Sequence, residues 1–241
     1  MIIIAGSCSM ESEEQALKLA NQLKKRNIDY VRAAIFKPRT DPNTFQGLGY
    51  VALPALKKIR EMGLKTVTEV VDPRQIDPVY DHVDVYQVGT RNMHNFSLLK
   101  ELGKVDKPVI LKRGLCAYMD EWLKAAEYIE KGGNGQVILC ERGIRSFDVI
   151  TRNVLDIGAI IYLKKKTGYQ VLVDPSHSMG HREFVVDAAK AGLAAGADGV
   201  MVEVHEEPDR ALTDSKQTID LPTLDTLLDE VEWEKVPHDH I

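Results

Sequence analysis

Residues 169–177 read YQVLVDPSH, a continuous apolar run that ends in Asp174 and His177. The same arrangement recurs in seven further runs, at residues 2–8, 30–40, 65–70, 83–91, 108–114, 136–143 and 198–205. Each run is strand-like and carries reactive or charged side chains near its C-terminal end. Eight such runs are typical of a (β/α)8 barrel, whose active site gathers at the C-terminal rim of the strands. We therefore predict that polar residues spread along the chain converge on one mouth.

Helical patterns lie between these runs. Residues 12–26 begin with Ser12 and Gln15 at capping-box spacing and continue as an amphipathic pattern. Similar stretches are expected at residues 50–63, 73–81, 94–103, 119–132, 147–166, 182–195 and 221–233. Strands that alternate with helices imply a parallel sheet, and 241 residues suit one barrel. We predict a single (β/α)8 TIM barrel over residues 1–241, without an N-terminal regulatory extension. A doubly wound open sheet is the alternative, although the chain has no glycine-rich dinucleotide loop.

Composition restricts the partners and the compartment. The formal net charge is −5, which fits nucleic-acid binding poorly because such domains are usually basic. No apolar run reaches the length of a membrane span, about 18 residues. Cys8, Cys116 and Cys140 are odd in number and far apart, which argues against a disulfide framework. We expect a cytoplasmic protein that binds neither nucleic acid nor membrane, and we expect its tail, VPHDHI, to have no role.

Two connections are longer than a barrel turn requires. Residues 37–49 carry proline, asparagine and glycine, and residues 205–220 join the last strand to the last helix. Loops longer than about 12 residues in a compact domain are usually functional or disordered. We interpret both as active-site loops.

Four side chains at the predicted strand ends and in the last loop form a candidate metal site. Cys8, His177, Glu203 and Asp214 offer sulfur, nitrogen and oxygen donors. Such a mixed set suits a borderline divalent transition metal better than Mg²⁺ or Ca²⁺. Alternatively, Cys8 is a buried small hydrophobe and Asp214 caps a turn. His205, on the same side of its strand as Glu203, is a candidate to support the metal from outside its ligand set.

Cations cluster at the ends of the predicted strands, against the acidic background of the chain. Lys37-Pro38-Arg39-Thr40 is interpreted as a phosphate grip, because Pro38 restrains the directions of its neighbours. The alternative is a solvated basic turn. Further basic residues at strand ends are Arg32, Arg91, Lys112, Arg113 and Arg142. Cations that converge in one cleft repel each other unless an anion lies among them, so a ligand with carboxylate and phosphate groups is expected.

Glu69 and Asp174 are acidic residues at predicted strand ends that lie outside the candidate metal site. Each could orient a lysine, a histidine or a water. The alternative is that each simply pairs with nearby cations.

Motifs along nearly the whole chain resemble one enzyme family. They are AGSCSMES, RAAIFKPRTDPNTFQGLG, TEVVDPRQ, YQVGTRNMHNF, PVILKRG, VILCERGIRSF, VDPSHSMGHR and MVEVHEEPDRALTDSKQ, in this order. The chain thereby resembles the type I beta class of 3-deoxy-D-arabino-heptulosonate 7-phosphate (DAHP) synthases. That resemblance implies a metal-dependent barrel that condenses phosphoenolpyruvate with erythrose 4-phosphate, in the first step of the shikimate pathway of aromatic amino acid biosynthesis.

The resemblance also implies a role for each motif residue. It makes Cys8, His177, Glu203 and Asp214 the ligands of one divalent ion, which is Mn²⁺, Fe²⁺, Co²⁺ or Zn²⁺. It assigns phosphoenolpyruvate to Arg32, Lys37, Arg91, Lys112 and Arg142. It assigns the phosphate of the aldose to Arg39 and Thr40. It further implies a homo-oligomer, a tetramer or a dimer, and an enzyme insensitive to aromatic amino acids and prephenate because no regulatory domain is expected.

Lys37, Glu69 and Lys112 are the expected catalytic residues. Lys37 is the candidate to protonate the new alkoxide, and Glu69, or a water held by Glu69 and Lys112, is the candidate base. Three alternatives stay open. They are a 3-deoxy-manno-octulosonate 8-phosphate synthase that uses arabinose 5-phosphate, a Schiff-base aldolase with Lys112 as nucleophile, and a non-catalytic phosphosugar-binding barrel.

Overall fold

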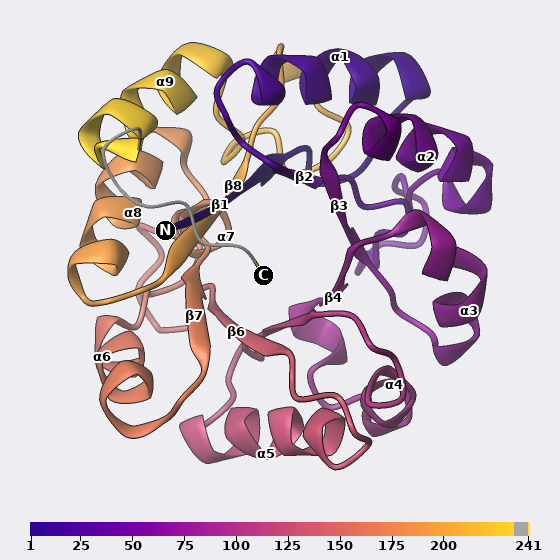
Figure 1. Cartoon of the computed structure of the whole chain (residues 1–241). Helices are drawn as coiled ribbons and strands as arrows, with labels where there is room; N and C mark the ends of the chain where they lie inside the picture. The colour runs from indigo at the N-terminus through magenta and orange to yellow at the C-terminus, as the bar shows by residue number, and fades with distance from the viewer. Residues whose placement is uncertain (234–240) are drawn as a thin grey trace.

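Eight parallel strands form the centre of the molecule in this computed structural model, which describes residues 1–233 and 241. The strands are β1 (Ile2–Gly6), β2 (Tyr30–Arg32), β3 (Lys65–Glu69), β4 (Val85–Val88), β5 (Val109–Lys112), β6 (Val137–Glu141), β7 (Gln170–Val173) and β8 (Gly199–Glu203). Each strand pairs with its neighbours in sequence, and β1 pairs with β8 from Ile2↔Gly199 to Gly6↔Glu203. This last pairing closes the ring seen in Figure 1. The predicted (β/α)8 barrel is confirmed.

Helices surround the strands as an outer layer (Figure 1). They are α1 (Glu13–Lys24), α2 (Leu53–Glu61), α3 (Ile76–Val79), α4 (Phe96–Leu102), α5 (Met119–Glu130), α6 (Ile157–Lys166), α7 (Pro175–Met179), α8 (Val185–Ala194) and α9 (Leu221–Glu230). In α1, the Ser12 side chain accepts a hydrogen bond from the Gln15 backbone N–H at 3.1 Å. Leu19 and Leu23 are buried against the barrel, and each such burial stabilises the fold by about 1.5–3 kcal/mol.

Inward-facing side chains form two layers inside the barrel. The apolar layer consists of Ile2, Ile4, Tyr30, Val67, Val85, Ile110, Ile138, Cys140, Leu172 and Met201. Side chains alternate along a strand, so the residue two positions further on is directed inward as well. From β2 to β8 this next position holds Arg32, Glu69, Gln87, Lys112, Arg142, Asp174 and Glu203, which we call the polar layer. All seven side chains are buried.

Strand β1 differs from the other seven at the level of the polar layer. The position two residues after Ile4 is Gly6, which has no side chain, and the next alternate position is Cys8. Gly6 has a φ of 150°, and a Cβ atom there would lie 2.2 Å from the Arg32 carbonyl oxygen. Only glycine permits this close approach of β1 to β2. The backbone just before Cys8 is therefore fixed by the packing of the two strands.

One predicted helix is shorter than expected. The helix predicted over 147–166 begins only at Ile157, where the Asp156 side chain accepts from the Ala159 backbone N–H at 2.9 Å. The preceding residues form a loop closed by an antiparallel bridge between Ile144 and Val154. Phe147, Ile150 and Val154 have the spacing of an amphipathic helix in the sequence, but here they are exposed. Apolar periodicity was thus misleading, because no core lies behind this segment.

Two further differences concern β2 and α7. The second strand ends at Arg32, although its apolar run continues to Phe36. The short helix α7 was not predicted; it begins at Pro175 and ends before Gly180, whose φ is 72°.

In the part of the chain described here, no helix is both long and apolar enough to cross a membrane. The expectation for the tail falls largely on residues 236–240, which lie outside the described residues.

Candidate active site

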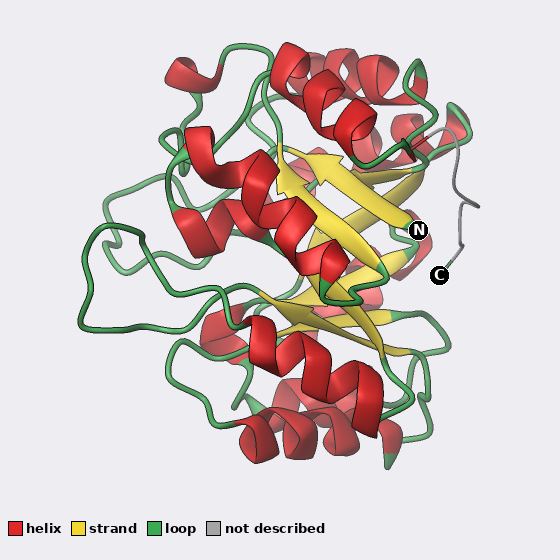
Figure 2. Cartoon of the chain, turned by 90° about the vertical axis from the view of Figure 1, so that its left-hand side faces the viewer, coloured by secondary structure: helices red, strands yellow, loops and turns green. Residues whose placement is uncertain are grey.

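A cavity of about 380 Å³ opens at the C-terminal end of the barrel. In Figure 2 the long loops extend from this end, toward which the strand arrows point. Its basic lining residues are Arg32, Lys37, Arg39, Arg91, Lys112, Arg142, Arg145 and Arg152. Three carboxylates, from Asp41, Glu69 and Asp214, also line it. Because eight basic residues face three acidic ones, the cavity attracts ligands with several negative charges.

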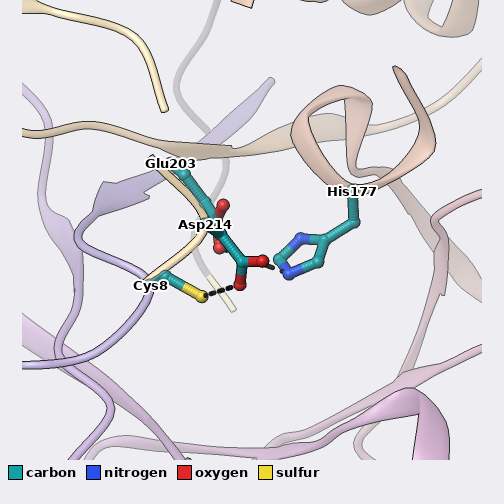
Figure 3. Close-up of side chains that lie close together, drawn as sticks. All are labelled: Cys8, His177, Glu203 and Asp214. Carbon is teal, nitrogen blue, oxygen red and sulfur yellow. Dashed lines mark hydrogen bonds and ion pairs between the residues drawn. The ribbon is translucent and has the colours of Figure 1, made fainter. Parts of the chain in front are cut away.

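The four candidate metal ligands lie together beside this cavity, and two of them, His177 and Asp214, line it. One donor atom from each of Cys8, His177, Glu203 and Asp214 lies within 4.8 Å of the other three. Figure 3 shows the four side chains pointing toward one another. They come from four places in the fold: the end of β1, helix α7, strand β8 and the loop that follows β8. The structure brings the predicted set together, and its role as a ligand set stays a prediction.

His177 is oriented by a buried carboxylate. Its Nδ1 atom lies 2.8 Å from Asp174 Oδ2, and its Nε2 atom lies 3.3 Å from Glu203 Oε1. Burial lowers the pKa of His177 to about 4, so the ring is neutral near pH 7. A neutral imidazole is the form that binds metal ions.

Cys8, Lys37 and Asp214 contact one another directly. The Cys8 thiol donates to Asp214 Oδ2 at 3.0 Å, and Lys37 Nζ donates to the same oxygen at 3.0 Å and to Cys8 Sγ. Burial raises the pKa of the Cys8 thiol, and binding of a cation would counteract that shift. Burial opposes the charge of Lys37, but its pKa is raised because Cys8 and Asp214 lie beside it.

Glu203 and Asp214 are both fixed by further hydrogen bonds. Arg32 Nη1 donates to Glu203 Oε1 at 2.6 Å, and Gln217 Nε2 donates to Glu203 Oε2 at 2.6 Å. Asp214 has a φ of 53°, an uncommon conformation for a residue other than glycine. Thr218 Oγ1 donates to the Asp214 backbone carbonyl at 3.0 Å and supports this conformation. Both carboxylates are therefore pre-positioned.

The residues assigned by resemblance to phosphoenolpyruvate all line the cavity. Lys112 Nζ forms an ion pair with Asp174 Oδ2 at 2.5 Å. Arg142 donates to the Gly143 carbonyl at 3.1 Å through Nη1, and burial lowers its pKa. Arg91 follows β4 and is exposed at the mouth. These cations leave donor groups available to an anionic ligand.

The predicted phosphate grip follows β2 as a loop. Arg39 and Thr40 line the cavity, and the Arg91 Nη2 atom donates to Thr40 Oγ1 at 3.2 Å. Lys37 is fixed through its backbone N–H, which donates to the Gln46 carbonyl at 2.8 Å. The predicted active-site loop at 37–49 thus lines the mouth. The alternative of a fully solvated basic turn is wrong for Lys37, which is only 9% exposed.

Glu69 and Gln87 form a buried polar pair. Gln87 Nε2 donates to Glu69 Oε2 at 3.0 Å, and both residues line the cavity. Gln87 Oε1 is buried without a hydrogen-bond partner among the described residues. An acceptor of this kind suits a bound hydroxyl group or water. Sequence reasoning missed Gln87, although its position two residues after Val85 could have indicated it.

The loop at 143–156 adds residues that the sequence did not reveal. Arg145 and Arg152 line the cavity, and Arg152 Nη1 donates to Asp214 Oδ1 at 3.1 Å. Arg113 lies outside the lining and instead pairs with Glu141 at 3.0 Å and Asp156 at 2.8 Å. The helix predicted over residues 147–166 concealed the position of Arg152.

His205 does not contact the candidate ligands. Its Nε2 atom lies 3.7 Å from Glu11 Oε2, and its Nδ1 atom accepts from the Glu207 backbone N–H at 2.9 Å. The position proposed for it beside the metal site is therefore not supported by these contacts. His205 instead links the loop after β8 to the loop after β1.

Known proteins of two related activities are similar to this chain. A "Phospho-2-dehydro-3-deoxyheptonate aldolase" of Thermotoga maritima is 43% identical over 230 residues, which are 95% of this chain and 68% of that protein. A "2-dehydro-3-deoxyphosphooctonate aldolase" of Desulfatibacillum aliphaticivorans is 29% identical over 250 residues, covering 96% of this chain and 90% of the relative. The chain is thus more similar to the first of these two enzymes.

Two solved structures of a DAHP synthase are similar to this chain as well. The crystal structure of the Thermotoga maritima DAHP synthase superposes with a TM-score of 0.93 at 42% identity, over 97% of this chain and 69% of that one. A truncated form of 3-deoxy-D-arabino-heptulosonate 7-phosphate synthase from the same organism gives a TM-score of 0.89 at 39% identity, over 97% and 86%. The model of the DAHP synthetase I family matches residues 1–237. The chain therefore belongs to the DAHP synthetase I family.

Proposed function

We propose that this chain condenses phosphoenolpyruvate, erythrose 4-phosphate and water into DAHP and inorganic phosphate. The observation that carries the proposal is one cavity that joins a four-donor cluster to eight basic residues. The cluster suits a metal ion and the basic residues suit two phosphorylated substrates. Similarity favours erythrose 4-phosphate over arabinose 5-phosphate, because the heptonate enzyme of Thermotoga shares 43% identity and the octonate enzymes share 28–30%.

The donor set fits a divalent transition metal. Cys8, His177, Glu203 and Asp214 provide one sulfur, one nitrogen and two carboxylates, a combination that accommodates Mn²⁺, Fe²⁺, Co²⁺ or Zn²⁺. The 3.3 Å approach of His177 Nε2 to a buried carboxylate supports this fit, because a cation would relieve the repulsion between two electron-pair donors. When bound, the ion supplies Lewis-acid polarisation of a carbonyl oxygen.

The basic residues divide between the two substrates. Arg32, Lys37, Arg91, Lys112 and Arg142 are proposed to hold phosphoenolpyruvate, and Arg39 with Thr40 is proposed to hold the phosphate of the aldose. Arginine suits both tasks because its planar group binds carboxylate and phosphate through two parallel hydrogen bonds. Holding both reactants in one cavity converts an encounter of two molecules into a reaction between positioned neighbours.

Lys37 is proposed to deliver the proton that the reaction needs. Carbon 3 of phosphoenolpyruvate attacks the aldehyde carbon, and the aldehyde oxygen becomes an alkoxide that must be protonated. Lys37 Nζ lines the cavity beside the four-donor cluster, 3.0 Å from Asp214 Oδ2. It is therefore placed to donate a proton there and to stabilise the developing negative charge.

Glu69 is proposed to activate the water. Water adds to carbon 2 of phosphoenolpyruvate, and the resulting hemiketal phosphate loses inorganic phosphate by cleavage of the carbon–oxygen bond. Glu69 lines the cavity with one oxygen held by Gln87, which leaves its second oxygen available to accept a proton. Lys112, which lines the same cavity, is proposed to hold the same water or the substrate anion.

We further infer a cytoplasmic homo-oligomer, a tetramer or a dimer. Support for self-association comes from the loop between β6 and α6, where Phe147 is 99% and Val149 is 91% exposed. Large apolar side chains two positions apart and exposed to this extent are uncommon on a monomer. Light scattering after gel filtration would report the molar mass, and a single 27.0 kDa species would contradict this inference.

Phosphate release from phosphoenolpyruvate and erythrose 4-phosphate tests the proposed function. The protein is stripped with EDTA and assayed with and without Mn²⁺, and arabinose 5-phosphate serves as the parallel aldehyde. We expect turnover that requires the metal and the four-carbon sugar. Turnover with arabinose 5-phosphate alone would assign the chain to the octonate reaction. Binding of both substrates without any turnover would support a binding barrel, and trapping of Lys112 by borohydride would support a Schiff base.

A further inference from the structure

Asp174 is a buried acid that belongs to neither the cavity wall nor the candidate ligand set. It follows β7 in the polar layer and is 0% exposed. It is absent from the residues that line the cavity and from the four candidate metal ligands. An ionised carboxylate is costly to bury unless it is fully paired. The partners of Asp174 therefore indicate why it is there.

Three donors converge on this one carboxylate. Oδ1 accepts from the His177 backbone N–H at 2.9 Å. Oδ2 accepts from Lys112 Nζ at 2.5 Å and lies 2.8 Å from His177 Nδ1. Both carboxylate oxygens already accept a hydrogen bond, Oδ1 from the His177 backbone N–H and Oδ2 from Lys112 Nζ. A carboxylate paired in this way acts only as an acceptor, so the proton between Asp174 and His177 is assigned to Nδ1.

The contacts of Asp174 orient two side chains, His177 and Lys112. On one side, a proton on Nδ1 leaves the Nε2 lone pair of His177 directed toward Glu203 and the donor cluster. On the other side, the ion pair fixes the otherwise flexible stem of Lys112 against the cavity wall. The same carboxylate thus determines the presentation of a candidate metal ligand and of a candidate substrate cation.

We propose that Asp174 is a positioning residue that serves both the metal site and the phosphoenolpyruvate site. The proposal rests on the proposed function, because it takes His177 as a ligand and Lys112 as a contact of phosphoenolpyruvate. Asparagine cannot replace Asp174 in this role, since its amide has one acceptor oxygen and a nitrogen that donates. In one orientation the amide nitrogen would face the His177 backbone N–H, and in the other it would face both Lys112 Nζ and His177 Nδ1.

Binding measurements on Asp174→Asn test the proposal without requiring turnover. Mn²⁺ affinity is measured by calorimetry, and phosphoenolpyruvate affinity is measured separately on the metal-free protein. We expect Mn²⁺ affinity to fall by roughly 10- to 100-fold, as for other partners of ligating histidines. We expect phosphoenolpyruvate affinity to fall by about tenfold, the effect of one misplaced charged hydrogen bond. Loss of only one affinity, or of neither, would overturn the proposal.

Three further variants give the comparison its controls. His177→Ala should lose Mn²⁺ and retain phosphoenolpyruvate, whereas Lys112→Met should do the reverse. Asp198→Asn is the matched control, because Asp198 also accepts from a lysine, Lys164, and from a backbone N–H, that of Val171, both at 2.7 Å. It lies at the opposite end of the barrel, and both affinities should be unchanged. If the unaltered chain bound no phosphoenolpyruvate, the proposed function itself would fail.

A measurement on the unaltered chain covers the case in which Asp174→Asn does not fold. Nitrogen-15 NMR of the metal-free protein distinguishes the two neutral tautomers of a histidine ring. We expect the His177 ring to carry its proton on Nδ1. A proton on Nε2 would place the lone pair toward Asp174 and would overturn the proposal.

Discussion

The apolar and polar layers of the barrel lie two residues apart on the same strands, and both are buried. On β5, Ile110 belongs to the apolar layer and Lys112 to the polar layer. Burial of Ile110 stabilises the fold, whereas burial of Lys112 costs several kcal/mol of desolvation that its ion pair only partly offsets. The apolar layer is needed for the barrel to fold. The buried charges of the polar layer are explained only by the chemistry of the cavity.

Pairing within the polar layer shows how this cost is contained. Arg32 pairs with Glu203 at 2.6 Å and Lys112 pairs with Asp174 at 2.5 Å. Each pair links two strands that have one other strand between them, β2 and β8 in the first pair and β5 and β7 in the second. The basic groups that line the cavity are thus neutralised by carboxylates that do not line it. The ion pairs at the opposite end, such as Lys164 with Asp198, are about 30% exposed and contribute little to stability.

Lys37→Met should give the largest functional effect. Removal of the proposed proton donor should lower kcat by roughly 10²- to 10⁴-fold, the usual contribution of general acid catalysis. Steady-state kinetics with Mn²⁺-loaded protein measures the change. Lys164→Met, at the other end of the barrel, is the matched control and should leave kcat within about twofold of the unaltered value. A loss of less than tenfold for Lys37→Met would contradict its assigned role.

Leu172→Ala should damage the apolar layer instead. Leu172 is fully buried beneath Asp174 on β7, and its truncation should lower the free energy of unfolding by about 2–5 kcal/mol. Urea unfolding followed by circular dichroism reports this change. Mn²⁺ affinity at 20 °C should stay nearly constant, because the polar layer keeps all its partners. A large fall in Mn²⁺ affinity with unchanged stability would show that the two layers are not separable.

Arg39→Ala should have the smallest of these effects and should be selective. The loss of one hydrogen-bonded contact to a phosphate costs about 1.5–3 kcal/mol, or roughly 10- to 150-fold in the KM for erythrose 4-phosphate. The KM for phosphoenolpyruvate should change little. Arg91→Ala is the reciprocal variant, and it should raise the KM for phosphoenolpyruvate. Equal changes in both KM values for either variant would refute the division of the cavity into two subsites.

Much of the fold and of the site could be predicted because strand patterns are local. Runs such as PVILKRG identify a buried strand and place Lys112 at its end. Closure of the barrel then determines that Cys8 and Asp214, 206 positions apart, lie at the same rim. The convergence of the four candidate ligands therefore follows from eight local patterns and one topological rule.

The remainder depends on tertiary contacts that no local pattern encodes. Phe147, Ile150 and Val154 have helical spacing but are exposed, so the loop that carries Arg152 was predicted as helix. The role of Asp174 required knowing that Lys112 and His177, 65 positions apart in the sequence, approach the same carboxylate. Sequence could place Asp174 at the end of a strand, but it could not choose between its partners.

A cobalt titration tests most directly whether the four-donor cluster is a metal site. Co²⁺ is added to the metal-stripped chain, and the near-ultraviolet charge-transfer band of a cobalt–thiolate bond is recorded. We predict one Co²⁺ per chain with this band, its loss in Cys8→Ser, and its retention in Cys116→Ser, because Cys116 is exposed and lies outside the cluster. A band that survives in Cys8→Ser, or no cobalt binding at all, would contradict the account.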